Sequence, residues 1–430
     1  MISANFILRQ ILDVKLGGYD VLGRKLFKLG RGFFKIPFYF IAIFSVLIIR
    51  TIRPWLLVRV GSLVSSRIGH FAANTELFLC ERDAGINVPH QHHINIFQFQ
   101  YKPICNQQLA VMWKKLFNIW PTWILSPIIQ INRLIPGGLL HEITQNTQHD
   151  RDVHNLLSQI PQHLKFTLEE EVKGSAGLQS LGIPKDGLFV CLTVRDSSYL
   201  AAHLIGSDFS YHNYRDANVQ NYVLAAEELV NRGYYVIRMG AKVLTAINSN
   251  NPKIIDYATN GMRTDFMDIY LGAKCEFCVT QGSGFDAIPA VFRRPILQVN
   301  AVPLGYCYTW GPNAVFMTKH HIDNVSGCEL SMREIFSRGV GFSLHTSDFE
   351  SKGVCLIENS AEEIRDAVIE MSDRLAGVWK ETSDDDFLQT SFWKVFPINA
   401  VDPEKDKPLH GQIHSRFSAA YLRARPWWVE

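Results

Sequence analysis

Residues Thr280–Asn300 read TQGSGFDAIPAVFRRPILQVN, and this stretch decides the predicted fold. The apolar run Cys275–Thr280 (CEFCVT) has the length of a buried strand, Phe285–Phe292 has the character of a short helix, and PILQVN predicts another strand. A glycine-rich turn between a strand and a helix directs backbone N–H groups towards an anion. Such a turn is also where a tight bend is sterically cheap, so the tripeptide Gly282–Gly284 has two interpretations.

The same alternation extends through the second half of the chain. Gly187–Val194 (GLFVCLTV) is a continuous apolar run, typical of a strand that is buried on both faces of a parallel sheet. Val219–Gly233 predicts an amphipathic helix ended by glycine, and Tyr234–Gly240 predicts the next strand. Alternating short strands and helices predict a doubly wound parallel sheet.

The first half carries a weaker version of this pattern. Trp55–Gly61 predicts a strand and Ser65–Gly85 predicts a helix. A chain of 430 residues is too long for one ordinary core. We therefore predict an α/β fold with two domains in tandem and a cleft between them, at residues 54–180 and 181–430, preceded by a separate segment at residues 1–53.

Composition excludes several classes of protein. The formal net charge of +2 argues against a nucleic-acid-binding protein, which normally carries a strong basic excess. Most of the eight cysteines, including Cys191, Cys275, Cys278 and Cys355, lie in apolar runs and favour buried free thiols in a reducing compartment. No metal site is predicted, because the Cys275–Cys278 pair has no second pair and the histidines of Pro89–His93 (PHQHH) have no nearby carboxylate or cysteine.

The N-terminal segment differs from the rest of the chain. Residues 1–35 hold seven lysines or arginines against two aspartates, and an apolar run of fourteen residues follows at Ile36–Ile49, closed by Arg50 and Arg53. A bilayer span needs about twenty residues. We expect a peripheral anchor that holds a cytoplasmic protein on the anionic cytoplasmic face of the inner membrane. A buried first helix and a tilted membrane span are the alternatives.

Candidate ligand residues follow the predicted strands of the second domain, because ligands of open α/β sheets bind outside the carboxyl ends of the strands. Arginine suits such a site, since its planar guanidinium holds two phosphate oxygens at once. Taken singly, Arg195 could be a salt-bridge residue and Asp286 a first-turn helix residue. Together the candidates predict a diphosphate-bearing ligand, although neither a P-loop nor a G-x-G-x-x-G fingerprint occurs. They are Arg195, Ser197, Arg238, Gly240, Gln281, Gly282, Ser283, Gly284, Asp286 and Asn300.

The stretch Arg67–Leu79 (RIGHFAANTELFL) supplies candidates for the opposite side of the predicted cleft. Gly69 and His70 fall where the first predicted strand gives way to the first helix, directly after Arg67. His70 is a candidate general base, or a donor to a substrate oxygen. Glu76 lies about one and a half turns further along the helix, which places it at the cleft edge or in the core.

Long blocks of the sequence resemble a bacterial family. They include Arg67–Leu79, Val194–Leu200 (VRDSSYL) and the opening stretch, and the resemblance covers roughly residues 55–400. The family consists of inferred glycosyltransferases from surface-polysaccharide gene clusters. Membership implies a GT-B architecture, in which two Rossmann-like doubly wound domains face a cleft and the C-terminal domain holds the sugar nucleotide. The glycine-rich stretch is also similar to the donor site of other GT-B enzymes and of sugar-nucleotide 2-epimerases. This similarity implies that Gly282–Gly284 hold the diphosphate and Asp286 the ribose, although many of those enzymes have Glu where this chain has Asp.

Together these observations predict a metal-independent glycosyltransferase without a cofactor. It would transfer a sugar from a nucleotide sugar to a bacterial surface-glycan acceptor, which could be linked to a lipid. Arg195, Arg238 and the helix that begins at Gly284 would stabilise the leaving diphosphate, and His70 or Asp196 would be the base. The alternatives are a sugar-nucleotide epimerase of the same fold and a non-catalytic sugar-nucleotide-binding scaffold at the membrane.

Overall fold

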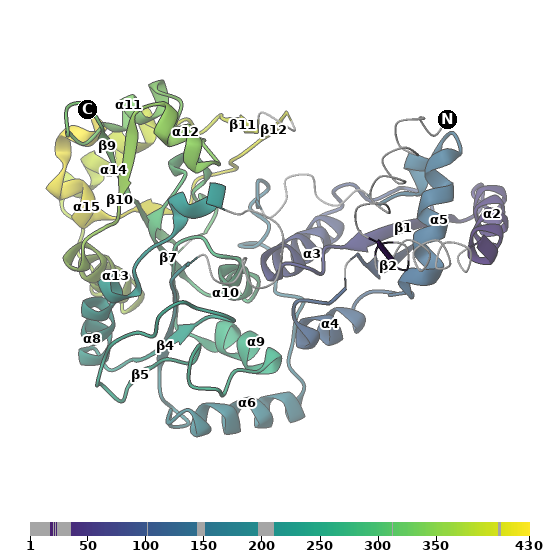
Figure 1. Ribbon diagram of the computed structural model, residues 1–430, viewed down its shortest axis with the longest axis horizontal. Coiled ribbons are helices and arrows are strands. Elements are labelled where there is room, and N and C mark those ends of the chain that lie inside the picture. Colours follow the sequence, from purple (N-terminus) through teal and green to yellow (C-terminus); the bar gives the residue numbers. More distant parts are fainter. Residues whose placement is uncertain are drawn as a thin grey trace. The chain divides into compact units, whose positions relative to one another are not determined.

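The computed structural model describes residues 36–100, 102–143, 151–196, 210–311, 313–402 and 406–430, together with residues 18, 19, 21 and 23. Ser197 and most of the basic N-terminal segment lie outside these residues. The described residues form two compact units (Figure 1). The smaller unit contains the described parts of 1–63, 89–100 and 117–144, and the larger contains those of 64–88, 101–116 and 145–430. The predicted domain boundaries stay a prediction.

A parallel sheet of seven strands forms the centre of the larger unit, in the order β13-β8-β7-β6-β3-β4-β5. The chain enters at β3, adds β4 and β5 on one side, and then returns to add β6, β7 and β8 on the other, which is the order of a doubly wound sheet. The strands are β3 (Phe189–Thr193), β4 (Tyr235–Met239), β5 (Ile254–Ile255), β6 (Cys278–Thr280), β7 (Ile296–Ala301), β8 (Val315–Thr318) and β13 (Arg416–Phe417).

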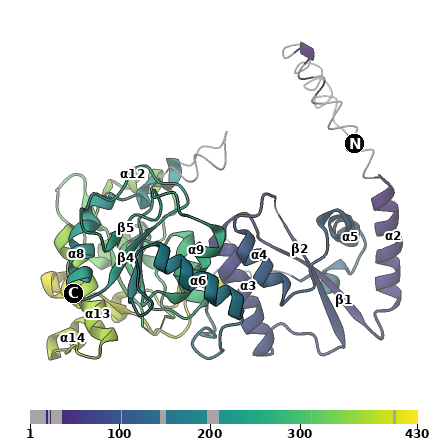
Figure 2. The same ribbon diagram turned by 90° about the horizontal axis from the view of Figure 1, so that it is seen from below.

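Helices cover both faces of this sheet (Figures 1 and 2). On β3, Val190 and Leu192 join the core beneath α8 (Val223–Asn231) and α13 (Ala361–Leu375). The alternate residues Phe189 and Cys191 join a second core that includes residues of α9 (Asp265–Lys274), on the other face. Burial on both faces explains the unbroken apolar run of this strand. The predicted α/β class with a doubly wound parallel sheet is confirmed.

Two helices from the first half of the chain belong to the larger unit. Helix α3 (Ile68–Asp83) packs against α10 (Ala287–Val291), which continues a single 3₁₀ turn, η4 (Gly284–Asp286). Helix α4 (Gln107–Lys114) packs against α9, where the Asn106 side chain donates to the Asp265 carbonyl oxygen at 2.9 Å.

The smaller unit contains the parallel strand pair β1 (Leu57–Leu63) and β2 (His93–Phe99). Helix α2 (Ile36–Thr51) lies beside α5 (Thr122–Leu134) in both views (Figures 1 and 2), and Tyr39 donates to Gln130 at 2.6 Å. In α2 only Ala42 and Val46 are buried, so most of its apolar side chains are exposed. Over the described residues, no helix combines the length and apolar character needed to cross a membrane.

Two further local predictions can be compared with the structure. The predicted capping box at Ser360 and Glu363 is present at the start of α13. All eight cysteines are free, but Cys355 is exposed and not buried as predicted, because it lies on the two-stranded sheet of β9 and β10. The remaining helices and strands are η1 (Gly138–His141), α6 (Leu168–Ser180), η2 (Ser210–Arg215), η3 (Val219–Tyr222), η5 (Leu304–Tyr306), β9 (His320–Asp323), α11 (Met332–Ser337), α12 (Thr346–Ser351), β10 (Val354–Ile357), α14 (Ser383–Val395), β11 (Val401–Asp402), β12 (Lys407–Pro408), α15 (Ala419–Ala424) and η6 (Pro426–Val429).

Candidate active site

A cavity of about 340 Å³ lies within the larger unit at the carboxyl ends of β3, β4 and β6. We call it the cationic cavity. It includes the point between β3 and β6 where the chain reverses its direction across the sheet, which is the usual ligand position in this class of fold. Its lining residues include Arg67, Gly69, His70, Cys105, Thr193, Arg195, Asp196, His212, Arg215, Gly240, Lys242, Arg263, Asp268, Gly282, Ser283, Gly284, Asp286 and Tyr308.

The Gly-Ser-Gly turn forms one wall of the cationic cavity. Gly282 has φ +79°, in the left-handed region that favours glycine. Thr280 Oγ1 accepts hydrogen bonds from the N–H groups of Gly282 at 3.2 Å and Ser283 at 3.4 Å. Gly284 then begins a helical turn, and the first N–H groups of a helix have no acceptor within that helix. The turn therefore satisfies its own first donors and directs a helix N-terminus at the cavity.

A second helix N-terminus faces the same cavity. Helix α3 begins directly after Arg67, whose side chain makes no capping hydrogen bond, and its first residues Ile68, Gly69 and His70 line the cavity. Each helix N-terminus carries partial positive charge from aligned peptide dipoles. Two of them around one space favour an anionic ligand.

Among the described residues, five cationic side chains line the cavity against three carboxylates. The Arg195 Nε lies 3.2 Å from Asp216 Oδ1, and burial followed by the nearby Arg215 lowers the pKa of Arg195. Arg215 donates to the Gly282 carbonyl oxygen, which attaches a guanidinium to the glycine turn. Arg263 and Asp268 form an ion pair at 2.6 Å.

His212 lies in a buried and positively charged part of the cavity. Burial, and then the charges of Arg195, Arg215 and Arg67, lower the pKa of His212 to about 4. Its Nδ1 is buried and has no hydrogen-bond partner among the described residues. The imidazole is therefore neutral at pH 7, because a further positive charge is disfavoured there.

Most of the predicted ligand residues meet at this cavity. Ten line it, while Ser197 lies outside the described residues and four others point elsewhere. The ten are Arg67, Gly69, His70, Arg195, Asp196, Gly240, Gly282, Ser283, Gly284 and Asp286. Their roles stay predictions, since proximity to a cavity does not assign a function.

Three residues at strand ends are buried behind the cavity wall. Gln281 donates to the Tyr222 hydroxyl at 2.6 Å and accepts from the Arg195 N–H at 2.8 Å. Asn300 donates to the same hydroxyl at 2.9 Å. Arg238 is 1% exposed, lies 3.3 Å from Asp256 and donates to the Thr245 carbonyl oxygen at 3.1 Å. With these contacts made, the three side chains stay out of the cavity lining.

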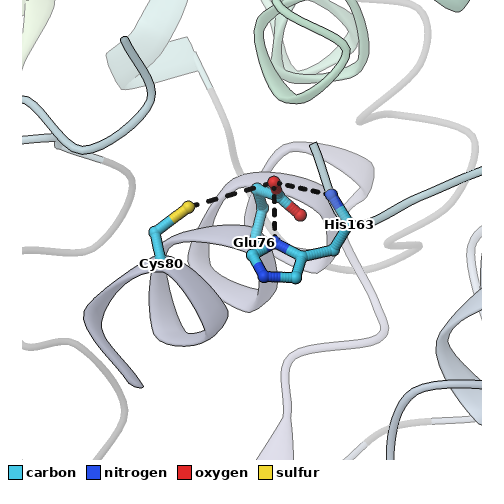
Figure 3. A group of neighbouring side chains, drawn as sticks. All are labelled: Glu76, Cys80 and His163. Carbon is cyan, nitrogen blue, oxygen red and sulfur yellow. Dashed lines mark hydrogen bonds and ion pairs between the residues drawn. The ribbon is translucent and has the colours of Figure 1, made fainter. Parts of the chain in front are cut away.

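Glu76 lies in a separate buried cluster with Cys80 and His163 (Figure 3). Its Oε1 is 3.1 Å from His163 Nδ1 and 3.9 Å from Cys80 Sγ, an arrangement that resembles a metal site. However, Arg293 Nη2 donates to the same Oε1 at 2.7 Å, and burial raises the pKa of the Cys80 thiol to about 12. A guanidinium charge already occupies this carboxylate, so we interpret the cluster as an ion-pair network.

The two predicted bases differ in their surroundings. His70 Nδ1 lies 3.3 Å from the Asn74 side-chain oxygen, one turn along α3. Asp196 accepts from the Leu244 N–H at 2.8 Å, which connects the end of β3 to the loop after β4. Both line the cavity, so either can reach a hydroxyl placed within it.

Sequence reasoning did not single out Arg215, His212, Arg263 or Tyr308. The first two belong to η2, which does not directly follow a strand, so a search of strand ends passes over them. The available signal was the block Tyr211–Asp216 (YHNYRD), where basic, aromatic and acidic residues gather within one short stretch.

No protein-family model and no curated protein matches the sequence, so the predicted family membership stays a prediction. Among solved structures, the chain is similar to a glycosyl transferase of family 9 from Veillonella parvula (12% identity, 61% of this chain and 86% of that one, TM-score 0.37). It is also similar to the E. coli ADP-heptose lipopolysaccharide heptosyltransferase II (12% identity, 73% of this chain and 100% of that one, TM-score 0.36). A Listeria monocytogenes protein assigned as a UDP-N-acetylglucosamine 2-epimerase is similar as well (9% identity, 83% of this chain and 99% of that one, TM-score 0.31). At these identities, function has to be derived from the residues of the cationic cavity.

Proposed function

We propose that the chain is a GT-B glycosyltransferase that takes its sugar from a nucleotide sugar. The observation that carries this proposal is the cationic cavity, where five cationic side chains and two helix N-termini surround one space at the switch point of a doubly wound sheet. A nucleoside diphosphate supplies the negative charge that such a space favours.

Different parts of the cavity lining would bind different parts of the nucleotide sugar. The diphosphate would lie against Gly282–Gly284 and the guanidiniums of Arg195 and Arg215, and Asp286 would accept a ribose hydroxyl. The loop after β4, with Gly240 and Lys242, would border the nucleobase. Arg238, which we predicted as a direct contact, would act through the loop that it orders.

The transfer needs a base and a stabilised leaving group. An acceptor hydroxyl oxygen forms a bond to the anomeric carbon, the bond from that carbon to the diphosphate breaks, and the hydroxyl proton passes to His70 or Asp196. Arg195, Arg215 and the helix N-termini stabilise the negative charge that develops on the departing nucleoside diphosphate, so no metal ion is proposed.

A thermal-shift screen against nucleoside diphosphates and their sugars, with EDTA present, tests the donor site. A ligand at 100 times its dissociation constant stabilises the folded state by about 2.7 kcal/mol. We expect one nucleotide to raise the melting temperature, and Arg195→Ala and Ser283→Ala to abolish the shift. Arg365→Ala is the matched control, since Arg365 pairs with its neighbour Asp366 on α13. If no nucleotide binds, the proposal is wrong.

Analysis of the reaction products then distinguishes the three functional hypotheses for a protein with this donor site. Release of nucleoside diphosphate that depends on an added acceptor supports the transferase. Isomerisation of the donor sugar without an acceptor supports the epimerase. Binding without either reaction, across a panel of glycan and lipid-linked acceptors, supports the non-catalytic scaffold.

We also propose that the N-terminal segment holds the protein on the cytoplasmic face of the inner membrane. Helix α2 exposes Phe40, Phe44 and Ile48 at 60–65%, beside a strongly basic sequence. Flotation with phosphatidylglycerol vesicles tests this, and Phe40→Glu with Phe44→Glu should abolish it. Phe387→Glu is the control because Phe387 on α14 is exposed to a similar degree, at 70%. Binding unaffected by the α2 variants contradicts the proposal.

A further inference from the structure

A second cavity, of about 400 Å³, lies in the larger unit and has no part in the donor site. We call it the apolar cavity. Its walls come from α3, the stretch at residues 157–161, α10, the start of β7 and the stretch before β8. Apolar side chains dominate its lining, among them Leu157, Ile160, Pro161, Val291 and Trp310.

The two cavities are neighbours along shared elements. Tyr308 lines both of them. On α3, His70 lines the cationic cavity and Ala73, one turn further along, lines the apolar one. On the segment η4–α10, Asp286 lines the first and Ala287 the second. The two cavities therefore adjoin at Tyr308.

The two arginines that line the apolar cavity are already engaged by the protein. Arg293 donates to Glu76, to the Ile160 carbonyl oxygen at 3.0 Å and to the Val291 carbonyl oxygen at 2.6 Å. Arg294 donates to the Cys275 carbonyl oxygen. A sugar placed here would bury hydroxyl groups without enough partners, which is costly. A hydrocarbon chain has no polar group to leave without a partner, and its entry removes apolar surface from water.

We propose that the apolar cavity binds the hydrocarbon chain of an amphipathic acceptor whose polar head enters the cationic cavity past Tyr308. The proposal rests on the proposed function and specifies its acceptor as a lipid-linked one. The ligand class is an alkyl or polyprenyl chain joined through phosphate to the group that accepts the sugar. The charge of that phosphate matches the cationic lining beyond Tyr308.

Displacement of the fluorescent fatty acid cis-parinaric acid by dodecyl phosphate, below its micelle-forming concentration, tests the site. The key variant is Ala290→Phe, which adds a ring on the α10 wall of the apolar cavity. Ala176→Phe is the matched control, because Ala176 is exposed on α6 and lines neither cavity. All proteins carry Phe40→Glu with Phe44→Glu, the changes that should remove apolar binding by the exposed face of α2.

We expect dodecyl phosphate to displace the reporter from the parent protein and from Ala176→Phe, and Ala290→Phe to weaken this binding at least tenfold. Ser158→Phe, which fills the cavity from its opposite wall, should do the same. The nucleotide-induced thermal shift should persist in both cavity variants, which shows that they are folded. Undiminished binding in both variants overturns the proposal, as does absence of reporter binding to a parent protein that binds nucleotide. Lipid binding without any nucleotide binding leaves the apolar cavity supported and overturns the proposed transferase.

Discussion

The backbones of Gly69 and Gly284 are in contact. A Cβ atom on Gly69 would lie 3.1 Å from the Gly284 Cα and 3.2 Å from its carbonyl oxygen, and a Cβ on Gly284 would lie 3.3 Å from the Gly69 nitrogen. This approach brings the N-termini of α3 and η4 to the same cavity, although 215 residues separate them in the sequence (284 − 69). The two glycines therefore act as a pair whose close approach brings two helix N-termini to the cationic cavity.

Replacement of Gly69 by alanine should weaken this assembly. The added methyl group meets backbone on its opposite side, which cannot turn away as a flexible side chain would. We expect a loss of stability of about 1–3 kcal/mol, as for overpacked positions, together with weaker nucleotide binding. Calorimetry of unfolding and nucleotide titration measure the two effects. Gly377→Ala is the control: its φ of +68° is strained by a side chain, but no atom lies within 4 Å, so nucleotide affinity should not change.

Arg215 should be one of the main contacts of the diphosphate. Its guanidinium is attached to the Gly282 carbonyl oxygen and its Nε is buried without a partner in the described part of the chain. A hydrogen bond to a charged group contributes about 1.5–3 kcal/mol, so Arg215→Ala should lower nucleotide affinity about 10–100-fold. Titration calorimetry measures this loss. Arg215→Lys retains the positive charge but loses the paired N–H donors of the planar guanidinium. A nucleotide affinity equal to that of the parent would show that these paired donors do not contribute to binding.

The sheet of the larger unit was predictable because each strand carries its own sequence pattern within a few consecutive residues. A strand that buries both faces is apolar along nearly its whole length, as in Phe189–Leu192, and this pattern can be recognised without knowledge of the neighbouring strands. The Gly-Ser-Gly turn was predictable for the same reason, since Gly282 adopts a backbone angle that favours glycine.

The rest of the cavity depended on long-range packing. The end of a strand indicates position but not direction: Arg195 reaches the cavity, whereas Arg238 and Asn300 turn into the interior. Arg215 reaches the glycine turn from η2, 67 residues away in sequence. Glu76, predicted near the cleft or core, is buried with Arg293, a partner that no local pattern identifies.

Glu76 should stabilise the fold without contributing to nucleotide binding. It is fully buried, bonded to Arg293 and His163, and absent from the lining of the cationic cavity. Removing one partner of a buried ion pair costs about 3–5 kcal/mol. Glu76→Ala should therefore lower the free energy of unfolding by about this amount and leave nucleotide affinity unchanged. A lower affinity at full folding would place Glu76 in the binding machinery.

His320 should make stability decline at alkaline pH. Its ring nitrogens lie 2.6 Å from Glu329 and 2.9 Å from Glu363, and these carboxylates outweigh burial and raise the pKa of His320 to about 9. Because the folded-state pKa exceeds the unfolded value of about 6.5, the stabilisation is complete below pH 6.5 and is lost as the pH rises to about 9. The difference corresponds to roughly 3 kcal/mol. Denaturant unfolding from pH 6 to 10 measures it, and His320→Gln should flatten the profile.

His212 should sense occupancy of the cationic cavity. In the free protein, burial and the charges of Arg195, Arg215 and Arg67 hold its pKa at about 4. A bound diphosphate adds negative charge to the same lining, so the pKa of His212 should rise on binding. By linkage, binding then takes up protons, and nucleotide affinity increases as the pH falls towards the bound-state pKa. NMR titration of the His212 ring, with and without nucleoside diphosphate, measures the shift directly. In His212→Asn the part of the pH dependence that arises from this ring should disappear, and an unshifted His212 pKa at saturating nucleotide would place the diphosphate elsewhere.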